Sequence, residues 1–294
     1  MAMPLIVSLS QAVSALQLAS FQPVDDTIRT SRRLDAFDSD EDIEWNYDSP
    51  CPEYFCSKSK KITFELYLKN FATHQAQEPQ HMCPTINFGS FSRSDIVSLA
   101  VARTGSRSLV RTLRASQGDV VRVLHHHACT ASNLQRWGVQ RAVISIRPLH
   151  ERMVSEYAHS PRALGAFRWE DDGHIDAVFN NFVDALRRKN HPQHVEAMDA
   201  VWRKSEYMYP ITEYYLKNAP GDMDIQVVCT CNFHEDLKAA LKKWNVDYVQ
   251  GDEDPYTPNY PRPTLSDINI AWIKEVFQPD YEFYYKHCAK CDKE

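Results

Sequence analysis

The sequence predicts an α/β fold, a single domain with a parallel sheet flanked by helices on both faces. Runs of apolar and β-branched residues typical of buried strands occur near 96–101, 120–125, 141–146 and 223–230. Helical segments separate these runs, and such alternation implies a parallel sheet covered on both sides. The chain has 294 residues, 43% of them hydrophobic, which is enough for one large domain.

Three later segments carry the apolar stripe of a core-facing helix. The stripes consist of Ile175, Val178, Phe179, Phe182, Val183 and Leu186 in the first, Leu237, Ala240, Leu241 and Trp244 in the second, and Ile268, Ala271, Trp272, Val276 and Phe277 in the third. Apolar residues spaced three and four apart lie on one face of a helix. We therefore assign these residues to the core rather than to a site.

The N-terminal part has a different composition. Residues 25–48 contain nine Asp or Glu and three Arg, including the run Asp38–Asp42. A stretch so acidic and so poor in apolar residues cannot bury a core, so we predict a solvated linker. The sequence thus predicts an acidic, partly disordered extension over 1–59 and the folded domain over 60–294.

The first twenty residues are mildly apolar but contain several Ser and Gln and have no basic start. They are too short and too polar to indicate a firm membrane segment. A degenerate signal peptide or a trimmed anchor stays open. The expected location is the secretory pathway or Golgi lumen if the N-terminus is such a signal, and the cytoplasm otherwise.

Charge is distributed unevenly along the chain. The net charge is −6, yet residues 101–152 carry nine arginines against Asp119 and Glu151. This segment is therefore +7 and the rest −13. A local positive cluster in an acidic protein focuses its field on a small polyanion, whereas nucleic-acid binders show a broader basic surface. We expect an anionic ligand and no nucleic acid.

Two strand-to-helix segments lie within this basic region. The strand-like run 96–101 breaks into Ala-Arg-Thr-Gly-Ser-Arg-Ser-Leu at 102–109. A short turn there points several backbone N–H groups at one spot, and the helix N-terminus adds about half a positive charge. Segment 144–157 repeats the design, with Arg147 at the strand end and Arg152 and Ser155 three apart on one helical face. The pair predicts a clamp for a doubly phosphorylated nucleotide.

These segments resemble the nucleotide site of sulfotransferases, which use 3′-phosphoadenosine 5′-phosphosulfate (PAPS) on a P-loop-type fold. The family's first motif, roughly Pro-Lys-Thr-Gly-Ser/Thr-Thr/Ser-Ser-Leu, holds the 5′-phosphosulfate; its second, Arg-Asp-Pro-x-x-Arg-x-x-Ser-x-Tyr, holds the 3′-phosphate. The positions that match are Thr104, Gly105, Ser106, Ser108 and Leu109 in the first motif and Arg147, Arg152, Ser155 and Tyr157 in the second. The resemblance covers roughly residues 95–287, and its specific part is 101–157.

The departures concern charge and side-chain size. Arg103 stands where the family has lysine, Arg107 replaces a small hydroxyl residue, and Pro148-Leu149 replaces Asp-Pro. Arginine keeps the charge but spreads it over a planar fork of donors. The resemblance implies that PAPS is held by Arg103, Thr104, Gly105, Ser106, Arg107, Ser108, Arg147, Arg152 and Ser155. It implies a catalytic role for Arg103 and requires no metal.

Three histidines, His125 to His127, follow the predicted strand at 120–125. In the uronyl 2-O-sulfotransferase branch, which acts on carbohydrates, a His-x-His follows the equivalent strand. Alternation puts His125 and His127 on the same side of the strand end. The resemblance implies that one of them takes the proton from an acceptor hydroxyl, expected on a carbohydrate, because imidazole titrates near working pH.

Two other classes stay open. A P-loop kinase or NTPase has the same architecture, but its Gly-x4-Gly-Lys-Ser/Thr motif is absent, and Arg147 stands where a magnesium-binding Asp is expected. A non-catalytic module could grip a sulfated glycan through the same arginines. The eight cysteines permit disulfides around the domain, at Cys51/Cys56 and Cys288/Cys291, or a zinc site with two further ligands.

Overall fold

The computed structural model describes residues 95–117, 129–159, 167, 174–203, 208–251 and 261–291. All of them belong to the second of the two units into which the chain divides, Asp48–Glu294. The predicted extension over 1–59, its boundary with the domain and the predicted strand near 120–125 lie outside the described residues.

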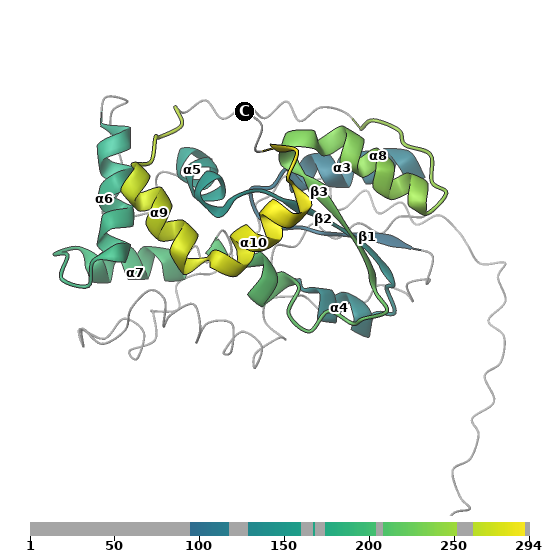
Figure 1. Ribbon diagram of the computed structural model, residues 1–294, viewed down its shortest axis with the longest axis horizontal. Helices are drawn as coiled ribbons and strands as arrows, with labels where there is room; N and C mark the ends of the chain where they lie inside the picture. The colour runs from purple at the N-terminus through teal and green to yellow at the C-terminus, as the bar shows by residue number, and fades with distance from the viewer. Residues whose placement is uncertain are drawn as a thin grey trace, which may run out of the picture. The chain divides into compact units, whose positions relative to one another are not determined.

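Three strands form a parallel sheet in the order β1-β2-β3 (Figure 1). They are β1 (Ile96–Leu99), β2 (Arg141–Ile146) and β3 (Asp224–Cys229). Ile96 pairs with Arg141, and Arg141 pairs with Asp224. Strands were predicted at all three places, and the α/β class is confirmed.

Helices alternate with the strands along the chain. In order they are α3 (Ser106–Gln117), α4 (Ala131–Arg136), α5 (Leu149–His159), α6 (Ile175–Arg187), α7 (His194–Arg203), the π-helix η5 (Ile211–Tyr215), the 3₁₀ turn η6 (Thr230–Asn232), α8 (Phe233–Lys243), α9 (Asp267–Val276) and α10 (Gln278–His287). The three predicted apolar stripes lie on α6, on α8 and the residue after it, and on α9 and the residue after it.

The two faces of the sheet face two separate cores. On one face, Ile96, Val143 and Val228 pack with leucines of α3 and α8, namely Leu109, Leu113, Leu237 and Leu241. On the other face, Val97 and Ile144 belong to a larger core that includes residues of α4, α5 and α6. Figure 1 accordingly shows α3 and α8 on one side of the sheet and α4 on the other. Helices therefore cover both faces, which agrees with the continuous burial of β1 and of β2 after its first residue.

Two disulfides join the end of β3 to the C-terminal end of α10. Cys229 bonds to Cys288 and Cys231 bonds to Cys291. The sequence permitted disulfides at Cys51/Cys56 and Cys288/Cys291; Cys288 and Cys291 are indeed disulfide-bonded, but to Cys229 and Cys231 and not to each other. Cys129 is also disulfide-bonded. Within the described ranges, no helix has the length and apolar character needed to cross a membrane.

Candidate anion-binding site

The turns that follow the three strands lie at one edge of the sheet. Leu99 pairs with Ile144 and Ile146 pairs with Cys229 in a parallel register, so the carboxyl ends of the strands are neighbours. In open α/β sheets this is the edge at which ligands bind. The β1–α3 turn and the β2–α5 turn carry the two basic motifs read from the sequence, and the structure places both at this edge.

The β1–α3 turn has an unusual backbone. Arg103 and Gly105 both lie in the left-handed region, with φ of 62° and 75°. This region suits glycine but is uncommon for arginine, so the turn stores strain that its surroundings must hold. The Gly105 carbonyl accepts from the Leu109 N–H at 3.0 Å, which starts α3. The first turn of α3 contains no acidic residue, so its N–H groups and the helix dipole favour an anion.

Thr104 fixes the centre of this turn. Its side chain is fully buried, and its hydroxyl donates to the Val101 carbonyl at 2.8 Å. The Ser145 hydroxyl of β2 lies 2.8 Å from the same oxygen. Because the Thr104 proton goes to Val101, the Ser145 hydroxyl is the donor in the second bond. This chain of bonds ties the first turn to the neighbouring strand.

Arg152 of α5 holds the backbone of the β1–α3 turn by hydrogen bonds. Its side chain is fully buried, and its Nε donates to the Ala102 carbonyl while Nη1 donates to the Tyr209 carbonyl, both at 3.1 Å. Burial lowers the pKa of its guanidinium, an effect that the nearby Asp280 opposes. The sequence predicted Arg152 as a phosphate ligand; in the structure its guanidinium donates hydrogen bonds to two backbone carbonyls.

Arg103 makes an ion pair with Glu156 of α5. Its Nε lies 2.5 Å from Glu156 Oε2, and the two side chains are 21% and 9% exposed. The bond links the first turn to the helix that follows the second strand. Because both side chains are poorly exposed, removing either one would leave the other as a largely buried, unpaired charge. Sequence analysis singled out Arg103 but did not identify Glu156 as its partner.

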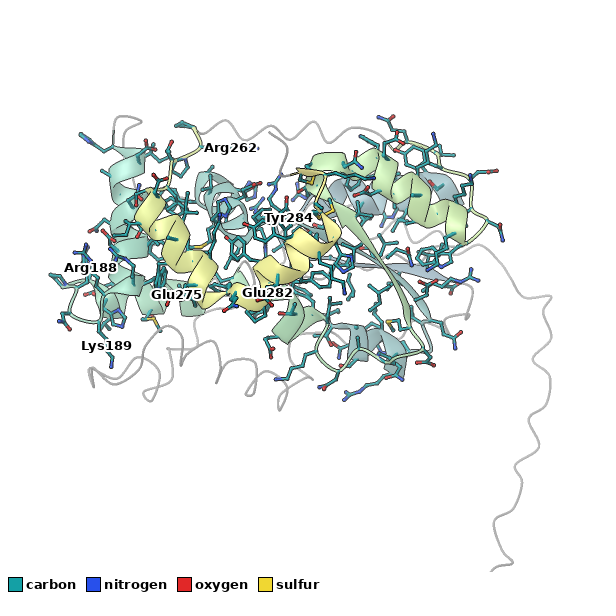
Figure 2. The ribbon with its side chains drawn as sticks, in the orientation of Figure 1. Arg188, Lys189, Arg262, Glu275, Glu282 and Tyr284 are labelled. Carbon is teal, nitrogen blue, oxygen red and sulfur yellow. A yellow bond between two sulfur atoms is a disulfide. The ribbon has the colours of Figure 1, made fainter. Side chains whose placement is uncertain are left out.

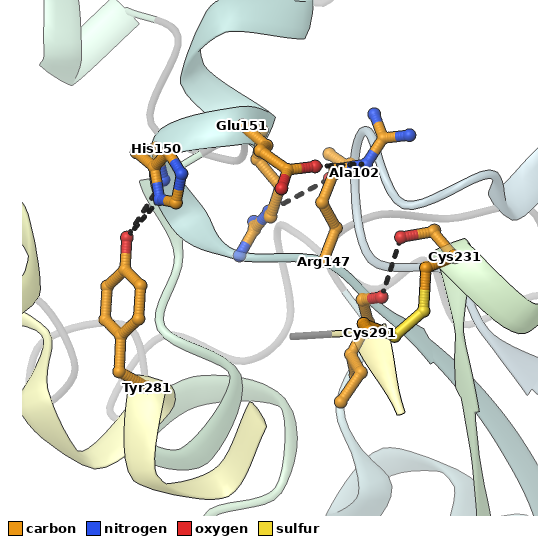
Figure 3. A network of polar contacts seen from close by, with 10 residues as sticks. Ala102, Arg147, His150, Glu151, Cys231, Tyr281 and Cys291 are labelled. Carbon is orange, nitrogen blue, oxygen red and sulfur yellow. Dashed lines mark hydrogen bonds and ion pairs between the residues drawn. A yellow bond between two sulfur atoms is a disulfide. The ribbon is translucent and has the colours of Figure 1, made fainter. Parts of the chain in front are cut away.

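Arg147 lies at the end of β2, with its side chain 23% exposed. Its Nε is 3.5 Å from the Glu151 carboxylate, four residues on (Figure 3). Burial lowers the pKa of the Arg147 guanidinium; Glu151 opposes this, and the positive charge of Arg262 adds to it. The two positive charges therefore act on each other near the end of β2, and the Glu151 carboxylate partly offsets them.

Arg262 comes from the segment before α9 and was missed in the sequence (Figure 2). The following residues are tied to α6: Asn180 Nδ2 donates to the Thr264 carbonyl, and its Oδ1 accepts from the Ser266 N–H, both at 2.8 Å. These bonds hold the segment in place. The only local signal is its position between two prolines, which is too common to indicate a site.

Helix α10 supports the start of α5. The Tyr281 hydroxyl lies 2.7 Å from His150 Nδ1 and accepts from the His150 N–H at 3.3 Å (Figure 3). Burial, reinforced by the charge of Lys274, lowers the pKa of His150 to about 4. The imidazole is therefore neutral, and its Nδ1 accepts a hydrogen bond from the Tyr281 hydroxyl. Asp280, also on α10, accepts from the Ile211 N–H at 2.6 Å and so caps η5.

The other predicted residues fall into two groups. Ser106 is buried, whereas Arg107 and Ser108 in the first turn of α3 and Ser155 in the middle of α5 are half-buried. His125 and His127 lie outside the described residues, so their predicted role as proton acceptor stays a prediction.

Comparisons of the chain with protein-family models, with curated proteins and with solved structures found no match.

Proposed function

We propose that the protein is a PAPS-dependent sulfotransferase with a P-loop-type nucleotide site. The observation that carries the proposal is the meeting of two basic strand-to-helix turns at one sheet edge, one with a left-handed glycine before a helix start and one ending in Arg147. These turns bear the motifs that resemble the two phosphate-binding motifs of sulfotransferases.

The donor set fits a nucleotide with two separate phosphate groups. The first turn offers backbone N–H groups and the half-buried Ser108, and it carries Arg103, whose Nε is bonded to Glu156. The second offers Arg147 and Ser155, with Arg262 as a further cation. Arg152 acts here through the Ala102 carbonyl, holding the first turn in shape.

The residues of this chain would bind the nucleotide, orient it toward the acceptor and take up the proton of the acceptor hydroxyl. When bound, PAPS supplies the sulfuryl group, whose bond to the 5′-phosphate oxygen breaks as a bond to the acceptor oxygen forms. Arg103 and the amides of the first turn stabilise negative charge at that end of the nucleotide. His125 or His127 takes the proton of the acceptor hydroxyl at a ring nitrogen, and the acceptor is expected on a carbohydrate.

The disulfides bear on location. Cys229–Cys288 and Cys231–Cys291 favour an oxidising compartment such as the secretory or Golgi lumen, because glutathione and thioredoxin keep cytosolic thiols reduced. This agrees with carbohydrate sulfation as the activity.

Calorimetry with 3′-phosphoadenosine 5′-phosphate (PAP), and separately with ATP and magnesium, tests the proposal. Tight PAP binding without metal is the expected result. Magnesium-dependent ATP binding would instead identify a P-loop kinase or NTPase. Affinity for a sulfated glycan with no PAP binding and no turnover would identify a binding module.

A further inference from the structure

The turn after β3 borders both anion-binding turns. The Thr230 hydroxyl donates to the Ile146 carbonyl at 3.2 Å, directly before Arg147. The methyl group of Thr230 would lie 3.9 Å from a Cβ added at Gly105. Thr230 thus lies against the backbone of the first turn and is bonded to the residue that precedes the second.

Two disulfides flank Thr230 in sequence, one at each neighbouring residue. On the inner side, Cys229 ends β3, its N–H donates to the Asp236 carboxylate at 3.0 Å, and its sulfur bonds to Cys288. The second, outer bridge joins Cys231 to Cys291, which follows the C-terminal end of α10 (Figure 3). The position of Thr230 is therefore fixed by covalent bonds as well as by hydrogen bonds.

The two bridges differ in exposure. Cys229 and Cys288 are 2% and 1% exposed, whereas Cys231 is exposed and Cys291 half-buried. A thiolate must reach a sulfur atom to open a disulfide, so accessibility sets the order in which the bridges react. The outer bridge can be opened while the inner one still anchors β3 to α10.

We propose that the turn Cys229-Thr230-Cys231 is a third segment that borders the anion site, after the β1–α3 and β2–α5 turns. The outer bridge, Cys231–Cys291, holds Thr230 against the Ile146 carbonyl and the Gly105 backbone. The inference rests on the proposed function. Thr230 is a positioning residue, because it acts through the Ile146 carbonyl and the Gly105 backbone. Opening the outer bridge loosens both turns without unfolding the domain.

Opening requires a dithiol reductant. Its thiolate attacks one sulfur of the Cys231–Cys291 bridge, the S–S bond breaks, and a mixed disulfide forms. The second thiol of the reductant then displaces the protein sulfur. The protein gains two electrons and two protons as two thiols, and the reductant leaves as a cyclic disulfide.

The test uses the full-length protein, oxidised and then treated with dithiothreitol until alkylation and mass spectrometry show Cys231 and Cys291 free and Cys229 and Cys288 bridged. Hydrogen exchange over residues 102–109 should become about tenfold faster. The affinity for PAP should fall about tenfold, because a preorganised site lowers the cost of binding. The double variant Cys231→Ser/Cys291→Ser should show the same faster exchange and the same weaker PAP binding, and the reductant should change neither.

The Thr230 variants separate positioning from general stability. Thr230→Val keeps the shape but loses the bond to Ile146, so PAP affinity should fall about threefold or more. Thr230→Ser keeps the hydroxyl and should bind PAP like the wild type. If the double serine variant does not fold, the reductant-treated wild type and the variants Thr230→Val and Thr230→Ser still test the inference.

Unchanged exchange at residues 102–109 after the outer bridge opens would overturn the inference. If the oxidised wild type binds no PAP, the sulfotransferase proposal falls, and exchange at the first turn alone decides the inference. Reductant-dependent exchange would then support the positioning role of the bridge, and its absence would contradict it.

Discussion

The β1–α3 turn and the β2–α5 turn share a sheet edge but are held in different ways. The first has two residues in the left-handed region and is fixed by the buried bonds of Thr104 and by Arg152 from behind. The second is a regular start of α5, and its Arg147 is partly exposed beside Glu151. The first turn is thus defined by backbone shape, whereas the second contributes mainly charge. Substitutions in the first should change stability, and those in the second should change ligand preference.

The largest expected effect lies outside both turns, in the histidines between them. If one of them is the general base, the variant His125→Ala or His127→Ala should lower turnover by about 10² to 10⁴. PAP affinity should stay within a few-fold, because the base contacts the acceptor. His126→Ala is the matched control and should do much less. Full activity of a folded His125/His127 double variant would exclude histidine as the base.

Arg152 tests whether the first turn depends on buried support. Arg152→Ala leaves the Ala102 and Tyr209 carbonyls without this donor and removes the cation near Asp280. We expect the free energy of unfolding to fall by about 3 kcal/mol or more, measured by urea denaturation. Arg147→Ala removes an equal charge from a 23% exposed site and should cost less than about 1 kcal/mol. Equal losses in the two variants would contradict the distinction.

How far the sequence predicts this arrangement depends on the range of the contact. The run of apolar residues located β2 at 141–146, because apolar character is a local property of the sequence. The same criterion predicted β1 to 101, but the strand ends at Leu99, where the Val101 N–H turns back to the Leu99 carbonyl. Ala100 and Val101 are apolar and buried without being in the sheet. Apolar character predicted their burial and not their conformation.

The site contacts were harder to predict because they join distant segments. The pair between Arg103 and Glu156 spans 53 residues, and the bond from Arg152 to Ala102 spans 50. Nothing in the local sequence distinguishes a fully buried arginine such as Arg152 from a partly exposed one such as Arg147, since both fit the same motif. Only the fold shows which of the two faces the core.

His150 makes the second turn sensitive to pH. Its pKa is about 4 in the folded protein and near 6.5 when unfolded, so between these values only the unfolded chain binds the proton. Stability therefore falls as the pH falls from 6.5 to 4, by about 1 to 2 kcal/mol after allowance for partial exposure. His150→Gln should flatten this part of the curve. The exposed His174→Gln is the control, and an unchanged slope in His150→Gln would refute the assignment.

Arg147 should set nucleotide preference rather than stability. The wild type should bind PAP at least tenfold more tightly than adenosine 5′-phosphate, an advantage of about 1.4 kcal/mol. Arg147→Ala should erase most of it, because the proposed function assigns the 3′-phosphate to this guanidinium. Calorimetry with both nucleotides measures the ratio. Equal affinity of the wild type for the two nucleotides would remove the basis for the nucleotide assignment.

Gly105 offers the finest test of the first turn. A Cβ added there meets no atom closer than the Thr230 methyl at 3.9 Å, so space is available and only the φ of 75° opposes a side chain. Gly105→Ala should therefore lower the free energy of unfolding by about 1 kcal/mol, the cost of a left-handed alanine. Gly221→Ala is the matched control, because its Cβ would meet nothing within 4 Å and its φ is not left-handed. Urea denaturation of the two variants compares them directly. If Gly105→Ala is as stable as Gly221→Ala, the backbone of the first turn does not require glycine, and its shape would have to depend on Thr104 and Arg152 alone.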